Sequence, residues 1–310
     1  AFAWYNLGRA YAKQGDYKKA RALWQKALEL NPKEMIAKLD LAVSDPSESN
    51  LEDRFREGEK ALREKHENDA LDHFNFYLTY KPESVIAYIR RGTANERLGR
   101  SEPALRDLNR AIALAPRSAE AYARRGDVYY ASGKYAESVK DYNTAIGMES
   151  GNASHYFGRG RVHLFYGRSD EALKDFTRAL ELKPGDAEYC RYRADAFTKM
   201  GRLADARRDL DRAIEASPAY AGAYSDRAVL SSRQGKYGDC ATDAGRAIAL
   251  DPENGDFHRL RGDCHFNLGR YADGLKDYDA AIKLNRWDPL AHSRRGLCLH
   301  RLGDRSGALA

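Results

Sequence analysis

The sequence predicts an all-α solenoid built from repeated pairs of helices. Glycine recurs every 34 residues through most of the chain, and an alanine column and a proline column share this period. The glycines are Gly99, Gly133, Gly167, Gly201, Gly235, Gly269 and Gly303. Apolar and small residues between them follow the period of a helix. A fixed spacing of this length is typical of stacked structural repeats, each of which buries its apolar face against its neighbours.

The repeats divide the chain into three segments. Residues 1–34 form a single repeat, residues 35–50 form an irregular linker, and residues 51–310 form a contiguous array of eight repeats. The eight are 51–84, 85–118, 119–152, 153–186, 187–220, 221–254, 255–288 and the truncated 289–310. The linker breaks the register and is rich in loop-forming residues. The last repeat holds one helix and the start of another, so we expect the natural chain to continue.

Each repeat is expected to contain two helices, and its positions are numbered below as places 1 to 34. In repeat 119–152, places 4, 8 and 11 hold Tyr122, Gly126 and Tyr129, which share one face of a first helix. Places 20, 24, 27 and 28 define the buried face of a second helix in the same way. The glycine at place 15 is expected just past the first helix, where a positive φ favours glycine. Proline at place 32 ends the second helix.

This pattern resembles the tetratricopeptide repeat family. The first repeat fills the family's signature places with Trp4, Leu7, Gly8, Tyr11, Ala20, Trp24, Ala27 and Pro32. The resemblance covers residues 1–34 and 51–310, and it implies a right-handed superhelical solenoid of helix-turn-helix repeats whose first helices line a concave groove. The pentatricopeptide family, which reads RNA, uses a related helical pair with a different period and signature, so it is the weaker match.

Charged residues occupy two fixed places of the repeat. Place 7 holds Arg91, Arg125, Arg159, Arg193, Arg227, Arg261 and Arg295, and place 23 holds Asp107, Asp141, Asp175, Asp209, Asp243 and Asp277. In the two outlying repeats the columns change together, to Leu7 with Leu23 and to Glu57 with His73. We therefore predict that places 7 and 23 of one repeat touch, as a ladder of arginine forks on carboxylates. The alternative is a basic stripe that binds phosphates, which the fixed aspartate partners argue against.

The residues expected to bind a partner lie on the first helices, at the places that the family resemblance assigns to the groove. They are Arg90, Arg97, Arg124, Tyr130, Phe157, Arg161, Leu164, Phe165, Arg191 and Lys199. Across the four central repeats these places carry six basic and five acidic side chains, whereas a nucleic-acid track is plainly basic. Phe157, Leu164, Phe165 and Tyr130 form an apolar patch among arginines, which is typical of an interaction hot spot. The alternative is that some of these rings pack against neighbouring helices.

The sequence indicates no catalytic or metal chemistry. The four cysteines (Cys190, Cys240, Cys264 and Cys298) are too few and scattered for a disulfide framework, and we interpret them as small apolar fillers. The histidines and cysteines of the last two repeats stand at places that are apolar elsewhere, and their spacing does not bring four ligands together. Phosphate-binding glycine loops, nucleophile elbows and HExxH motifs are absent from the sequence. We expect no cofactor.

We therefore expect a non-catalytic scaffold that binds an extended segment or a helix of another protein along the groove, near residues 86–199. One alternative is a structural assembly or self-association module that uses the ends and the convex surface of the array. A regulatory arm of an enzyme that lies outside this sequence is another. With a net charge of +6, a mean hydropathy of -0.73 and no long apolar run, the chain is expected to be soluble, without nucleic-acid partners or membrane insertion. The sequence does not identify the compartment, although the cytoplasm is favoured.

Overall fold

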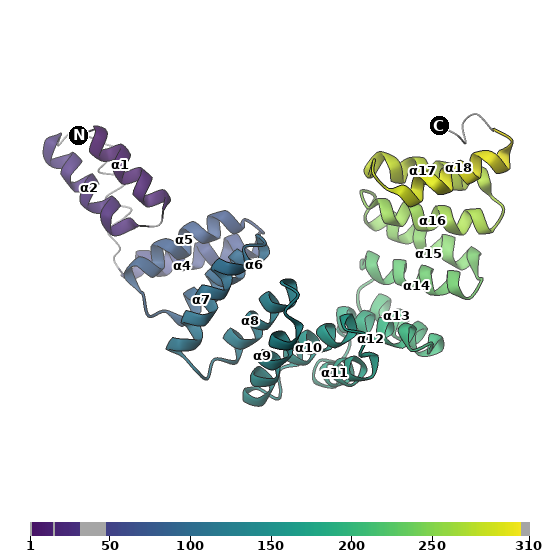
Figure 1. Ribbon diagram of the computed structural model, residues 1–310, viewed down its shortest axis with the longest axis horizontal. Helices are drawn as coiled ribbons and strands as arrows, with labels where there is room; N and C mark the ends of the chain where they lie inside the picture. The colour runs from purple at the N-terminus through teal and green to yellow at the C-terminus, as the bar shows by residue number, and fades with distance from the viewer. Residues whose placement is uncertain (1, 15, 32–47, 305–310) are drawn as a thin grey trace. The chain divides into compact units, whose positions relative to one another are not determined.

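The computed structural model describes residues 2–14, 16–31 and 48–304, and all regular structure in these ranges is α-helical (Figure 1). The predicted all-α repeat solenoid is confirmed. None of the helices in the described ranges combines the length and the apolar character that crossing a membrane requires. The chain divides into two compact units, Ala1–Gly151 and Asn152–Ala310, which we call unit 1 and unit 2 and describe separately.

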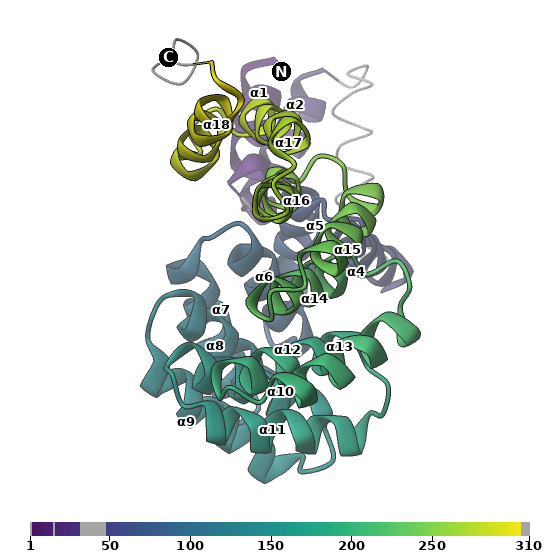
Figure 2. The ribbon, with the colours of Figure 1, turned by 90° about the vertical axis from the view of Figure 1, so that its right-hand side faces the viewer.

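The helices come in pairs, one pair for each repeat, except that α18 is the one described helix of the last repeat. Unit 1 contains α1 (Phe2–Lys13), α2 (Tyr17–Leu30), α4 (Glu48–Arg63), α5 (Glu67–Tyr80), α6 (Val85–Arg97), α7 (Ser101–Leu114), α8 (Ala119–Ala131) and α9 (Tyr135–Met148). Unit 2 contains α10 (Ala153–Phe165), α11 (Ser169–Leu182), α12 (Ala187–Lys199), α13 (Leu203–Ala216), α14 (Ala221–Arg233), α15 (Tyr237–Leu250), α16 (Gly255–Asn267), α17 (Tyr271–Leu284) and α18 (Pro289–Leu302). Figures 1 and 2 show the helices of unit 2 following one another in chain order.

The linker predicted over residues 35–50 lies outside the described residues, except for its last three. Those three belong to α4, which begins at Glu48 rather than at the predicted repeat boundary.

Local signals set the ends of the helices. Asp186 caps α12 by accepting hydrogen bonds from the backbone N–H groups of Glu188 and Tyr189, both at 3.1 Å. From Gly99 to Gly303, the seven described glycines at place 15 have positive φ, between 70° and 89°. Lys65 stands where repeat 51–84 lacks this glycine, and it is the one described non-glycine residue with a positive φ, at 62°. The turn therefore requires this backbone conformation whichever residue occupies it.

Small residues allow the two helices of a repeat to pack closely. A Cβ placed on Gly160, at place 8, would lie only 2.7 Å from the ring of Phe176, at place 24 of the same repeat. Ala172 and Ala179, at places 20 and 27, are fully buried beside that ring. The close approach of α10 and α11 therefore depends on glycine and alanine at the places that the sequence selects.

First helices of successive repeats also contact one another within each unit. In unit 1, α6 contacts α4 and α8, and in unit 2, α14 contacts α12 and α16. From α4 onward, successive second helices of the described chain make no contacts of comparable extent. Within each unit the first helices therefore line the inner side of the stack, which is where the family resemblance places a groove.

The arginines at place 7 and the aspartates at place 23 form the predicted pairs. In each of the six pairs, Nε and Nη2 of the arginine both donate hydrogen bonds to the carboxylate. The shortest contact of each pair is 2.6 to 2.7 Å long. The aspartates are buried and the arginines are partly buried. Hydrogen bonding to Asp209 raises the pKa of Arg193, because the carboxylate stabilises the charged guanidinium.

Arg91, Arg125 and Arg227 make a second contact that the sequence analysis does not predict. Arg91 Nη1 donates to Asn75 Oδ1 at 2.8 Å, and Arg125 Nη1 donates to Asn109 Oδ1 at 2.7 Å. Arg227 Nη1 donates to Asp211 Oδ1 at 2.8 Å in unit 2. Each acceptor stands at place 25 of the preceding repeat. One guanidinium therefore connects both helices of its own repeat to the second helix of the repeat before it.

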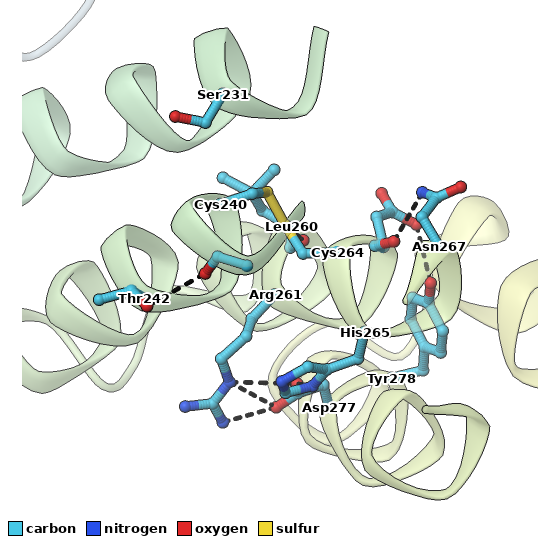
Figure 3. Close-up of a disulfide and its surroundings, with 12 residues drawn as sticks. Ser231, Cys240, Thr242, Leu260, Arg261, Cys264, His265, Asn267, Asp277 and Tyr278 are labelled. Atoms are coloured by element: carbon cyan, nitrogen blue, oxygen red, sulfur yellow. Dashed lines mark hydrogen bonds and ion pairs between the residues drawn. A yellow bond between two sulfur atoms is a disulfide. The ribbon is translucent and has the colours of Figure 1, made fainter. Parts of the chain in front are cut away.

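The interpretation of all four cysteines as apolar fillers is wrong for one pair. Cys240 of α15 and Cys264 of α16 form a disulfide (Figure 3), whereas Cys190 and Cys298 are free and buried. Cys240 stands at place 20 and Cys264 at place 10 of the following repeat, two places that meet when repeats stack. The 24 residues that separate them in the sequence hide this proximity.

Breaking one arginine–aspartate pair is expected to cost more than removing the whole pair. We choose Arg193 and Asp209, and replace each with leucine, because the first repeat carries leucine at both places. Each single replacement should lower the free energy of unfolding by about 3 kcal/mol, since it leaves a partly buried charge without its partner. The double replacement should cost less than either single one, because it leaves no unpaired charge. Urea unfolding followed by circular dichroism measures this cycle, and additive effects would contradict direct pairing.

The contact between repeats is expected to contribute less than the pair within a repeat. Replacing Asn109 with alanine removes the acceptor for Arg125 Nη1, and should lower the free energy of unfolding by about 1 kcal/mol. Thr177 stands at the same place of repeat 153–186, but it makes no such bond to Arg193, so Thr177→Ala is the matched control. Equal urea midpoints for the two variants would show that the Asn109 contact is not stabilising.

Candidate interaction surface

The predicted partner-binding residues all lie on first helices, divided between the two units. Those of unit 1 are Arg90 and Arg97 on α6, and Arg124 and Tyr130 on α8. Those of unit 2 are Phe157, Arg161, Leu164 and Phe165 on α10, and Arg191 and Lys199 on α12. The structure shows which side chains are exposed on each inner face and which are already held by neighbouring helices.

In unit 1, ion pairs and hydrogen bonds hold two of the arginines. Arg90 Nε lies 3.2 Å from Glu59 Oε1, and its Nη1 lies 2.6 Å from Glu120 Oε1, so Arg90 connects α4, α6 and α8. Arg97 Nη1 donates to the carbonyl oxygen of Leu62 at 2.6 Å. Arg124 is exposed and lies near Asp127 of its own helix. Two of the three candidate arginines of unit 1 therefore connect helices of different repeats.

In unit 2, the aromatic and aliphatic candidates separate into core and surface residues. Phe157 and Leu164 are buried, and the ring of Phe157 stacks on Tyr189 with a centroid separation of 4.5 Å. Phe157 and Leu164 therefore pack against neighbouring helices, which is the alternative that the sequence analysis left open. Phe165 is 62% exposed at the end of α10. Phe157 and Leu164 are thus not surface contacts in this conformation, although the sequence places them beside Phe165.

A network of arginine, tyrosine and aspartate side chains connects α12 and α14. Arg191 Nε lies 2.6 Å from Asp226 Oδ2, and Arg191 Nη1 donates to Tyr220 Oη at 3.1 Å. The guanidinium of Arg191 also lies over the rings of Tyr192 and Tyr220, each 5.7 Å from the ring centroid. Burial raises the pKa of Asp226, and the contact with Arg191 opposes that shift.

A hollow of about 350 Å³ lies beside this network, between α12 and α14. Leu210 and Leu230, each 1% exposed, form an apolar base with Val229. Its remaining lining residues are Arg191, Tyr192, Ala194, Asp195, Thr198, Asp226 and Arg233. Lys199 lies outside the lining and pairs with Asp195 at 3.1 Å. The hollow thus combines an apolar base with two carboxylates and two guanidinium groups, and it belongs entirely to unit 2.

Sequence reasoning missed Asp226, Val229 and Arg233 as lining residues. They stand at places 6, 9 and 13 of repeat 221–254, which are groove places by the rule applied to the four central repeats. Extending that rule by one repeat identifies them. No rule of this kind identifies Leu210, which comes from the second helix α13.

The histidines of the last repeats make local contacts. His258 Nε2 lies 3.2 Å from the carbonyl oxygen of Pro252, and His292 Nε2 lies 3.0 Å from that of Arg286. His265 Nδ1 lies 3.0 Å from Asp277 Oδ2, so it joins an arginine–aspartate pair (Figure 3). Over the described ranges, histidine, cysteine and acidic residues form no group of three or more that could hold a metal ion.

Comparisons with known proteins bear on the fold and the family. A tetratricopeptide repeat model matches residues 1–34. A second tetratricopeptide repeat model matches the overlapping segments 92–153, 123–187, 157–221, 192–239, 225–285 and 265–310. Together the matches cover more than half of the chain. No match to a curated protein is found.

Several solved structures are similar in fold. The APC/C hetero-tetramer Cut9–Hcn1 matches with a TM-score of 0.66 and 13% identity, over 92% of this chain and 54% of that one. A tetratricopeptide repeat protein from Parabacteroides merdae matches with a TM-score of 0.61 and 17% identity, over 80% and 98% of the two chains. The pilF protein of Pseudomonas aeruginosa matches with a TM-score of 0.60 and 17% identity, over 68% and 96%.

At these identities the structural likeness shows the fold alone, and the chain spans about half the length of the Cut9–Hcn1 chain that it matches. The family models identify the repeat itself, because they match the segments in which the helical pairs recur. The chain belongs to the tetratricopeptide repeat family.

Proposed function

We propose that this chain is a non-catalytic scaffold that binds a segment of another protein on the inner face formed by its first helices. Tetratricopeptide repeats commonly mediate interactions between proteins. The observation that carries the proposal is the hollow between α12 and α14, which is lined by groove places and has an apolar base. The structure of Cut9–Hcn1 is a hetero-tetramer, so a protein of similar fold assembles with another chain.

The composition of the hollow favours a lysine or arginine side chain of the partner. Leu210, Val229 and Leu230 offer apolar surface to the methylene groups of such a side chain. Asp195 and Asp226 lie in the same lining, paired with Lys199 and Arg191 respectively. The pair between Lys199 and Asp195 is half-exposed and therefore weak, so the charged end of a partner side chain can displace Lys199 at little cost. An extended segment or a helix would place one such residue in the hollow and continue along the neighbouring first helices.

The charges of unit 1 argue against a nucleic-acid track. Arg90 is already paired with Glu59 and Glu120, and Arg97 donates to a carbonyl of α4. Phosphate binding would have to displace these contacts, which makes neutralisation of a nucleic-acid backbone unfavourable. The inner-face arginines of unit 1 are better explained as connections between repeats.

A second candidate function, self-association, is supported by exposed apolar residues near the last helix. Leu290, Leu297 and Leu302 of α18 are 59%, 44% and 48% exposed, and Trp287 just before α18 is 83% exposed. Apolar residues gathered in this way often mark a surface that another chain covers.

Peptide selection tests the proposed scaffold function. A library of random peptides is selected on the full chain, and we expect enrichment of segments with lysine or arginine beside apolar residues. The affinity of a selected peptide, measured by fluorescence anisotropy, should fall about tenfold or more in the Asp195→Asn/Asp226→Asn variant. Asp239→Asn, on the second helix α15, is the matched control. Selection of acidic peptides, or equal affinity for all three proteins, would contradict the assignment of the hollow.

Solution mass separates the two candidate functions. If α18 mediates self-association, sedimentation should give a mass above the 34.9 kDa of one chain, and Leu290→Glu/Leu297→Glu should return it to that value. The Asp195→Asn/Asp226→Asn variant should leave the mass unchanged. A monomeric wild-type chain over a broad concentration range would exclude the α18 surface as a strong self-association site.

A further inference from the structure

The disulfide joins two different repeats through their buried faces. Cys240 and Cys264 are both fully buried, and their Cα atoms lie 5.9 Å apart, within the usual range for a disulfide. Figure 3 shows Cys264 pointing toward Cys240 of α15, while Arg261 and His265 of the same helix approach Asp277. Helix α16 is thus covalently bonded to the preceding repeat and ion-paired within its own.

The position of this disulfide follows from the repeat. Place 20 of one repeat packs against place 10 of the next, and other junctions fill the two places with Ala172 and Ala196, or with Ala206 and Leu230. One repeat further on, a Cβ built on Gly274 would lie 3.5 Å from Cys298 Sγ. The structure therefore explains why cysteines at these two places meet.

At the junction between α15 and α16, the arginine also lacks the second contact that Arg91, Arg125 and Arg227 make at theirs. Place 25 of repeat 221–254 is Gly245, which offers no side-chain acceptor to Arg261. Arg261 keeps its partner within the repeat, Asp277, at 2.6 Å. The disulfide thus lies at a junction where the arginine makes no hydrogen bond to the preceding repeat.

We propose that Cys240 and Cys264 are a reversible thiol–disulfide site. Whether the two cysteines are oxidised or reduced sets the stability of the α15–α16 junction. The oxidant is a low-molecular-weight disulfide, with glutathione disulfide as the representative. The fold itself does not need the bond, because alanine or leucine fills these places at other junctions. The oxidation state of the two cysteines then changes the stability of one junction between repeats, while the helices on either side stay formed.

Oxidation of the two cysteines needs no reactant besides glutathione disulfide. One cysteine loses its proton and attacks a sulfur of glutathione disulfide, which forms a mixed disulfide and releases one glutathione thiolate. The second cysteine, also deprotonated, attacks the protein sulfur of the mixed disulfide and releases the second thiolate. The two protons pass to the two released thiolates. Two cysteines are oxidised and one glutathione disulfide is reduced to two glutathione molecules.

Burial controls the rate of this exchange. Neither sulfur is accessible in the closed junction, so attack by an external thiol requires α15 and α16 to separate first. Reduction by dithiothreitol should therefore be slow under native conditions and fast in urea. Burial also raises the pKa of the free cysteines Cys190 and Cys298, which keeps them in the less reactive thiol form.

Mass spectrometry locates the bond. The full chain is equilibrated with oxidised and reduced glutathione, alkylated in denaturant and digested with trypsin. Under oxidising conditions we expect peptide 237–246 linked to peptide 262–270, with Cys190 and Cys298 alkylated. Under reducing conditions all four cysteines should be alkylated. Four alkylated cysteines after oxidation in both native buffer and urea, or a bond to Cys190 or Cys298 instead, would overturn the proposal.

Thermal unfolding tests the effect of the bond. Reduction should lower the melting temperature of the wild-type chain by about 5 °C or more. Cys240→Ala and Cys264→Val should remove this redox response while keeping the helical signal, because other repeats carry alanine at place 20 (Ala172) and valine at place 10 (Val128). Cys298→Ala, the matched control one repeat further on, should keep it. The proposal would be overturned if the melting temperature of Cys240→Ala still responded to reduction. It would also be overturned if that of the wild-type chain did not respond once the bond is mapped.

Discussion

The arginine at place 7 forms the interaction that joins the two helices of each of six successive repeats. It makes a fork-shaped contact with an aspartate sixteen residues later, and in several repeats its remaining amino group reaches an amide or carboxylate sixteen residues earlier. A single planar group therefore touches three helices. Lysine could not replace it, because a point charge cannot hold two parallel hydrogen bonds on one carboxylate and donate a third in another direction.

Much of the fold could be predicted because the chain contains several copies of one repeat, and these copies can be compared place by place. The concerted change to Leu7 with Leu23 indicated which places touch, and the recurring glycine at place 15 indicated a turn with positive φ. Contacts between repeats were harder to predict. Asn75, Asn109 and Asp211 form a polar column at place 25, yet polar residues on a helix are usually solvated, so the pattern alone did not identify a bond. The disulfide could not be predicted either, because it joins places of two different repeats, and comparison of the copies relates places within one repeat.

The sequence predicted which places of the repeat belong to the candidate surface, but not which side chains at those places are exposed. Every selected residue lies on a first helix, but the rule cannot tell that Phe157 turns into the core while Phe165, eight residues later, is exposed. Nor can it tell that Arg191 is held by Asp226 and Tyr220. Side-chain direction depends on the size of the residues on the neighbouring helices, so a surface defined by exposed aromatics needs coordinates.

Hydrogen exchange of the Arg227→Leu variant tests most directly whether one arginine couples adjacent repeats. Arg227 of α14 contacts Asp243 of α15 and also Asp211 of α13. The account predicts faster native-state exchange than in the wild type in α13, as well as in α14 and α15, because the loss of one guanidinium loosens two repeats. Faster exchange confined to α14 and α15, with α13 unchanged, would contradict it.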